Sequence, residues 1–148
     1  LDISDYLISD IRIDLIFFRT FISVMFDHAK QFASADTIVI AAPYWDLSFP
    51  STLKIYIENI YVTGIVSAYD ESGMPVGLCK AKELYYITTA GGPYDPTYSY
   101  GYIESLAKNY FGIPKTHLVK AEMLDIIGND TEEILNQEVS RIFGNAIL

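Results

Sequence analysis

The sequence predicts a single α/β domain built on a doubly wound parallel sheet. Three β-branched or aromatic runs, at residues 37–42, 84–89 and 116–121, alternate with stretches whose apolar residues recur every three or four positions. Such runs are typical of strands covered on both faces by helices. Strand–helix alternation implies right-handed crossovers between parallel strands. The 148 residues suit one domain, because roughly 100–200 residues is the usual length.

The first elements of the chain carry the weakest patterns. An alternation of apolar positions predicts a strand around residues 11–17. A helix is expected at about 20–33, because one helical face would carry Phe21, Met25, His28 and Phe32. His28 is interpreted as a packed side chain of that face and not as a ligand.

A second helix and a turn-rich segment follow the strand at 37–42. The helix is expected from about Ser51 to Tyr61, with Pro50 suited to its start and Gly64 to its end. Residues 64–80 are predicted to form a loop or short hairpin, because they contain Asp70-Glu71-Ser72-Gly73 and Pro75.

Two more helices follow the strands at 84–89 and 116–121. The first is expected to end around Gly112 and Pro114 and carries Ile103, Leu106, Ala107 and Tyr110. Asp130 with Glu133 three residues later forms a capping-box pattern. It is expected to open a last helix that carries Leu135, Val139, Ile142 and Ala146.

Composition excludes several classes of function. The net charge of −9 argues against nucleic-acid binding, which requires a basic face. No apolar run approaches the ~20 residues of a membrane span, and the acidic start is not that of a signal peptide. The one cysteine, Cys79, indicates a structural thiol in a reducing, cytoplasmic setting. No metal site and no catalytic residue are predicted.

Two loops that follow strands hold the candidate site. The aromatic loop (residues 43–50) contains the chain's only tryptophan, and the glycine loop (residues 88–94) contains Gly91 and Gly92. Ligands of open α/β sheets bind outside the carboxyl ends of strands. Aromatic rings beside an open glycine backbone suit a flat heteroaromatic ligand. The alternative is that Trp45 and its neighbours simply cover the end of the sheet.

Both loops resemble those of a known family, the FMN-dependent NADH-azoreductases and NAD(P)H:quinone oxidoreductases of the flavodoxin-like fold. The resemblance covers about residues 26–130. It rests on Ala33-Ser34-Ala35-Asp36, on the stretch from Pro43 to Lys54, and on Thr88-Thr89-Ala90-Gly91-Gly92.

The resemblance implies a three-layer flavodoxin-like sandwich that binds FMN. NADH or NADPH would reduce the flavin, and a quinone, azo compound or similar small molecule would accept the electrons. The cofactor-binding positions would be Pro43, Tyr44, Trp45, Asp46, Leu47, Thr89, Ala90, Gly91 and Gly92. Tyr94 and Tyr69 would line the substrate side; packing of Tyr94, Tyr98 and Tyr100 within the protein is the alternative for that loop. A homodimer is also implied.

The chain departs from the family in three places. The family's first strand and its serine-rich loop around the FMN phosphate are absent or unrecognisable, and residues 1–25 match poorly. Because the sequence opens on Leu1, we expect it to lack its natural start. Asp46 stands where asparagine is common, and Ser67, with Tyr69 two residues on, stands where an aromatic often covers the flavin.

Two other functions remain open from the sequence. An acidic flavodoxin-like electron carrier without enzymatic turnover would also suit the net charge. A flavin-free structural remnant would suit the missing phosphate loop.

Overall fold

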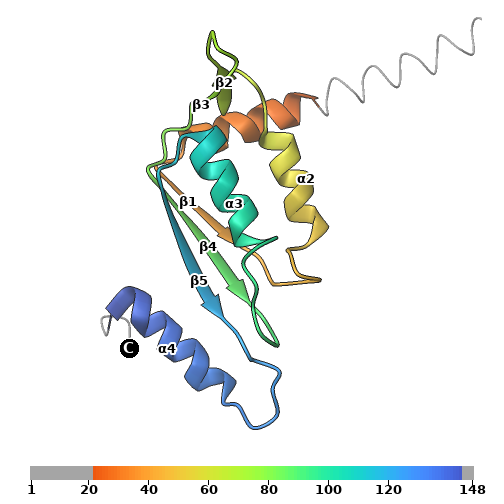
Figure 1. The fold of residues 1–148 in the computed structure, drawn as a ribbon, viewed down its shortest axis with the longest axis vertical. Coiled ribbons are helices and arrows are strands. Elements are labelled where there is room, and N and C mark those ends of the chain that lie inside the picture. The colour runs from red at the N-terminus through yellow and green to blue at the C-terminus, as the bar shows by residue number, and fades with distance from the viewer. Residues whose placement is uncertain (1–21, 145–148) are drawn as a thin grey trace, which may run out of the picture.

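A three-stranded parallel sheet forms the centre of the molecule. The computed structural model describes residues 22–144 (Figure 1). The strands are β1 (Thr37–Ala41), β4 (Glu83–Thr89) and β5 (Lys115–Ala121), in the order β1–β4–β5. The three predicted strands are therefore confirmed, whereas the strand predicted at 11–17 lies outside the described residues.

One face of the sheet is buried under three helices. The register places Ile38 beside Leu84, and both side chains are buried. They pack in one core with a helix over residues 22–34, with α2 (Ser51–Ile60) and with α3 (Tyr100–Leu106). The helix predicted at 20–33 is confirmed over its described part. Alternation along the strands thus fixes which side chains enter this core.

The other face is only partly covered. It presents Val39, Tyr85 and His117, which lie side by side in the register. The last helix, α4 (Thr131–Phe143), packs on this side against β5, the strand farthest from β1 (Figure 1). Val39 is accordingly 60% exposed. The prediction that strand 37–42 is covered on both faces is therefore wrong for the described part of the chain.

The turn-rich segment forms the predicted hairpin. Its strands β2 (Ser67–Tyr69) and β3 (Pro75–Gly77) are antiparallel. The Asp70 carboxylate accepts hydrogen bonds from the backbone N–H groups of Ser72 and Met74, both at 2.9 Å. This is the local side-chain bonding for which aspartate is favoured in turns.

The two helices of the buried face end differently. α2 ends at Ile60, and Gly64 (φ +87°) lies in the turn beyond it, so the expected glycine stop is wrong. α3 continues into a π-helical turn, η1 (Ala107–Phe111), which ends at Gly112 with φ +74°. That glycine end is confirmed, and a left-handed residue is what a helix end of this type requires.

The start of α4 gives a test of the capping pattern. Asp130 Oδ1 accepts a hydrogen bond from the Glu133 N–H at 3.0 Å, whereas the Glu133 side chain accepts from Gln137 and does not close the box. Asp130→Ala is expected to lower the free energy of unfolding by about 1 kcal/mol. Urea denaturation checks this, with Glu132→Ala as the control. Equal loss in both variants would contradict the cap.

Within the described residues, no helix has both the length and the apolar character that crossing a bilayer demands.

Candidate functional site

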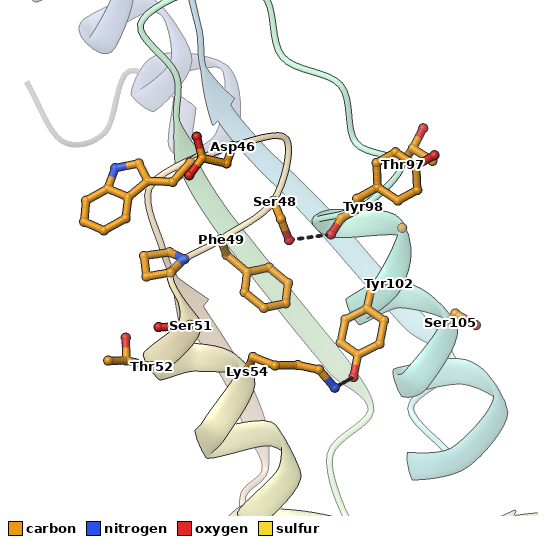
Figure 2. A pocket seen from close by; sticks show the side chains of 13 residues that line it. Asp46, Ser48, Phe49, Ser51, Thr52, Lys54, Thr97, Tyr98, Tyr102 and Ser105 are labelled. Carbon is orange, nitrogen blue, oxygen red and sulfur yellow. Dashed lines mark hydrogen bonds between the residues drawn. The ribbon is translucent and has the colours of Figure 1, made fainter.

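The two predicted loops lie side by side at the carboxyl edge of the sheet. The Ala42 N–H donates to Ile87 O at 3.0 Å and the Tyr44 N–H donates to Thr89 O at 2.9 Å. Pairing between the chain segments therefore continues past the end of β1. A further hydrogen bond links the aromatic loop to the segment just before α3: Ser48 Oγ donates to Tyr98 O at 2.8 Å (Figure 2).

The aromatic loop turns through a strained backbone. Trp45 and Ser48 exchange two backbone hydrogen bonds, of 3.1 and 2.8 Å, around Asp46 (φ +47°) and Leu47 (φ +68°). Left-handed conformations cost non-glycine residues roughly 1–2 kcal/mol each. The turn holds Trp45 59% exposed and Leu47 58% exposed. Backbone strain in a turn that exposes apolar side chains is typical of a functional loop.

The glycine loop presents two oriented N–H groups. Gly91 O accepts from the Asp125 N–H at 2.9 Å, and Gly92 O accepts from the Met123 N–H at 3.1 Å. The Gly91 N–H shares its peptide group with Ala90 O, which accepts from the Leu124 N–H at 3.2 Å, and the Gly92 N–H shares its peptide group with Gly91 O. Both peptide groups are therefore fixed, while their N–H groups donate to no residue in the described part of the chain. Such preorganised donors suit a ligand oxygen or ring nitrogen.

Space at the two glycines differs. Among the described residues, a Cβ on Gly92 would meet no atom within 4 Å, whereas a Cβ on Gly91 would overlap the Asp125 carboxylate. Gly92 thus borders open space, and Gly91 is packed under the segment that follows β5. A ligand can therefore approach the backbone closely at Gly92.

The other predicted cofactor-binding residues differ in how far they are exposed to solvent. Pro43 and Thr89 are exposed and Tyr44 is half-buried. Ala90 is buried, its N–H donates to Ala121 O at 2.8 Å and its carbonyl accepts from Leu124 at 3.2 Å. The backbone of Ala90 is therefore engaged within the protein, and contacts to a ligand fall to its neighbours.

Tyr94 does not line an open surface. Its side chain is 9% exposed, its hydroxyl bonds Ser99 Oγ at 2.8 Å and its ring lies edge-on to Tyr44 at 4.8 Å. Its N–H donates to Glu122 Oε2 at 2.8 Å, and burial raises the pKa of the Tyr94 phenol. The packed alternative therefore describes Tyr94, which braces the two loops.

An open hollow adjoins the aromatic loop. Its volume is ≈ 1090 Å³, and it lies between the aromatic loop, the start of α2 and the start of α3 (Figure 2). Trp45, Asp46 and Phe49 line one side, with Tyr98 and Tyr102 on the other and Lys54 at α2. This hollow is referred to below as the acceptor hollow.

Sequence reasoning missed part of this hollow. Phe49, Lys54 and Tyr102 were not among the predicted site residues. Tyr98, Tyr102 and Ser105 recur at spacings of four and three, which indicates one face of a helix. That pattern was the available signal, but the partner of the face is set by tertiary packing.

Tyr69 lies elsewhere. It is exposed on β2, in a second hollow of ≈ 490 Å³ that shares only Lys54 and Tyr102 with the acceptor hollow. The structure does not bring Tyr69 to either predicted loop.

Comparison with known proteins places the chain in a family. A family model described as the flavodoxin-like fold matches residues 19–143. A relative from Clostridium acetobutylicum, named FMN-dependent NADH:quinone oxidoreductase 2, is 42% identical over 120 residues, which are 77% of this chain and 59% of the relative. A relative from Coprothermobacter proteolyticus, named FMN-dependent NADH:quinone oxidoreductase, is 43% identical over 112 residues, covering 72% and 55% of the two chains.

Solved structures agree with this match. An FMN-dependent NADH-azoreductase from Bacillus anthracis, solved in complex with FMN, superposes with a TM-score of 0.69 at 30% identity. The aligned part covers 81% of this chain and 58% of that one. Another B. anthracis azoreductase gives a TM-score of 0.70 at 27% identity, covering 81% and 60%.

The chain therefore spans less than two thirds of the length of each of these four proteins. The family model nevertheless matches most of this chain. The parallel sheet of the chain, with helices on both sides, agrees with the fold of the azoreductases. This chain belongs to the family of proteins with the flavodoxin-like fold.

Proposed function

We propose that the chain carries the flavin-ring site of an FMN-dependent NAD(P)H oxidoreductase that passes electrons to a quinone, azo compound or similar acceptor. The observation that carries the proposal is the adjacency of the two loops, one with the exposed apolar side chains of Trp45 and Leu47 and one with two N–H groups that donate to no described residue. The names of the relatives and of the azoreductase structures support the chemistry.

The glycine loop fits the polar edge of a flavin. The N–H groups of Gly91 and Gly92 would donate to ring oxygen or nitrogen, and the open space at Gly92 would admit the ring edge. Bound FMN supplies the transfer of hydride and electrons. Donors fixed in advance stabilise the negative charge of the reduced ring without reorganisation.

The aromatic loop fits the apolar body of the ring. Trp45 and Leu47 stand exposed on the strained turn, where they would exclude water from a bound ring. The hydrogen bond from the Tyr44 N–H to Thr89 O would hold the two loops at a fixed separation around the ring. The aromatic loop and the glycine loop would thus hold the ring of FMN. We assign no described residue to its phosphate.

We also propose a homodimer in the cytoplasm. Exposed Trp45 and Tyr98 line the open hollow, and exposed Leu47 lies two residues from Trp45 on the same turn; a second subunit would cover these side chains. The lone thiol, Cys79, is buried, as suits a reducing compartment. Light scattering on the purified chain is expected to give twice the monomer mass. A monomer mass at all concentrations would contradict the dimer.

Asp46 is expected to lower the reduction potential of bound FMN. Its carboxylate stands on the strained turn and lines the acceptor hollow. A negative charge near the ring opposes the anionic hydroquinone. Asp46→Asn should raise the two-electron potential by about 30 mV, which is a tenfold change in the equilibrium constant. Dye-equilibrated titration measures it, and an unchanged potential would refute this role.

Steady-state turnover tests the proposed function. Purified protein loaded with FMN should oxidise NADH or NADPH continuously when a quinone such as menadione is present. A flavodoxin-like carrier would show slow single reduction without turnover. A chain that holds FMN but gives no catalytic NAD(P)H oxidation with quinones or azo dyes would overturn the enzyme assignment.

A further inference from the structure

Every carbonyl of the glycine loop from residue 89 to residue 92 already accepts a backbone hydrogen bond. The four donors are the N–H groups of Tyr44, Leu124, Asp125 and Met123, at 2.9, 3.2, 2.9 and 3.1 Å. The N–H groups of Gly91 and Gly92, in contrast, donate to no residue of the described range 22–144. A ligand at this loop therefore finds donors, and an acceptor without a partner must come from a neighbouring segment.

The carboxylate of Asp125 is such an acceptor. Asp125 is exposed, and its carboxylate lies so close to Gly91 that a Cβ there would overlap it. Lys120, the basic residue nearest to it in the sequence, pairs with Glu122 instead. Within residues 22–144, no side chain or backbone group donates to the Asp125 carboxylate. One acceptor without a partner thus stands beside the donors of the glycine loop.

The segment that carries Asp125 is held in place on both sides. Towards the glycine loop, the Asp125 N–H donates to Gly91 O at 2.9 Å. Away from the loop, Met123 O accepts from Asn129 Nδ2 at 2.9 Å. The donors of the loop and the acceptor beside them are therefore arranged before a ligand arrives, which reduces the cost of binding.

Donors with an acceptor beside them are the complement of an imide, in which an N–H group lies between two carbonyl groups. The flavin ring carries one such edge, and hydrogen bonds to the ring are among the ways in which a protein tunes a flavin. An imide N–H that donates to a carboxylate makes a charge-assisted hydrogen bond, which is roughly twice as strong as a neutral one.

We propose that Asp125 accepts the hydrogen bond of the imide N–H of the flavin ring, while the N–H groups of Gly91 and Gly92 donate to the imide carbonyls. The proposal rests on the proposed function, because it takes the flavin ring as the ligand of the glycine loop. Asp125 is then a residue that determines specificity, since it selects rings with a free imide N–H over rings that carry an alkyl group there.

The experiment compares lumiflavin with 3-methyllumiflavin, in which a methyl group replaces the imide hydrogen. Both compounds lack the phosphate, and their binding is followed by flavin fluorescence without NAD(P)H. The wild-type chain is expected to bind lumiflavin about tenfold more tightly, because the methyl group leaves the carboxylate without its donor. Asp125→Ala should bring the ratio of the two dissociation constants close to one. Asp125→Asn should keep a ratio of about three, since an amide oxygen accepts without the charge.

A matched control separates this effect from a general loss of negative charge. Asp36 precedes β1 at the opposite edge of the sheet and pairs with Lys80, so Asp36→Ala should keep the wild-type ratio. Equal affinity of the wild-type chain for both flavins, or a ratio that Asp125→Ala leaves unchanged, would overturn the proposal and leave the ring site in place. A ratio of one in Asp125→Asn would contradict the hydrogen bond. A wild-type chain that binds neither flavin would overturn the proposed function as well.

Discussion

Gly92→Val is expected to weaken FMN binding about 100-fold, or about 2.7 kcal/mol, with little change in the stability of the fold. A Cβ at Gly92 meets no atom of residues 22–144 within 4 Å, so a side chain there enters the open space beside the N–H groups of the glycine loop. In the proposed site, that space receives the edge of the ring. The valine would therefore compete with the ligand and not with the protein.

Fluorescence titration of FMN measures this effect, and thermal unfolding measures the fold. Thr63→Val, at an exposed position beyond α2, is the control for an exposed valine elsewhere in the chain. A Gly92→Val protein that binds FMN as tightly as the wild type would show that the glycine loop does not contact the ring.

Gly77→Ala is expected to cost about 3 kcal/mol of unfolding free energy. A Cβ on Gly77 would overlap backbone atoms of Phe111 and Gly112, and backbone cannot rotate away as a side chain can. Gly112 has φ +74°, so the end of η1 has little freedom to adjust. The hairpin would separate from the helix end, and the hydrogen bond from the Cys79 N–H to Phe111 O would be lost.

Urea denaturation checks this loss. Val76→Ala, at the exposed neighbouring position of β3, is the control and should cost less than about 1 kcal/mol. Similar losses in the two variants would mean that the hairpin shifts freely over the helix end.

Local patterns were sufficient to predict most of the fold. The β-branched run from Thr37 and the run through Leu84 form strands, because β-branched and aromatic side chains favour the extended backbone of a sheet. Gly112 ends its helix because few other residues adopt its left-handed backbone. The sequence did not predict that Val39 would be exposed, since coverage of a face depends on where α4 packs.

The site was predicted only in part, because local patterns locate its loops but not the side chains that tertiary packing brings to them. The two loops follow strands, and parallel strands bring their carboxyl ends together, so the adjacency of Tyr44 and Thr89 was predictable. The burial of Tyr94 was not, because it depends on Ser99 and on Glu122, which follows β5. Lys54 and Tyr102 come from different helices, and only their packing brings them to one hollow.

The absorption spectrum of the purified chain, after addition of excess FMN and removal of the unbound fraction, tests the central claim most directly. If the two loops hold the flavin ring, the wild-type chain retains the visible bands of the flavin, NAD(P)H bleaches them, and Gly92→Val retains much less. A wild-type chain that emerges colourless would contradict the account and would leave a flavodoxin-like scaffold without flavin.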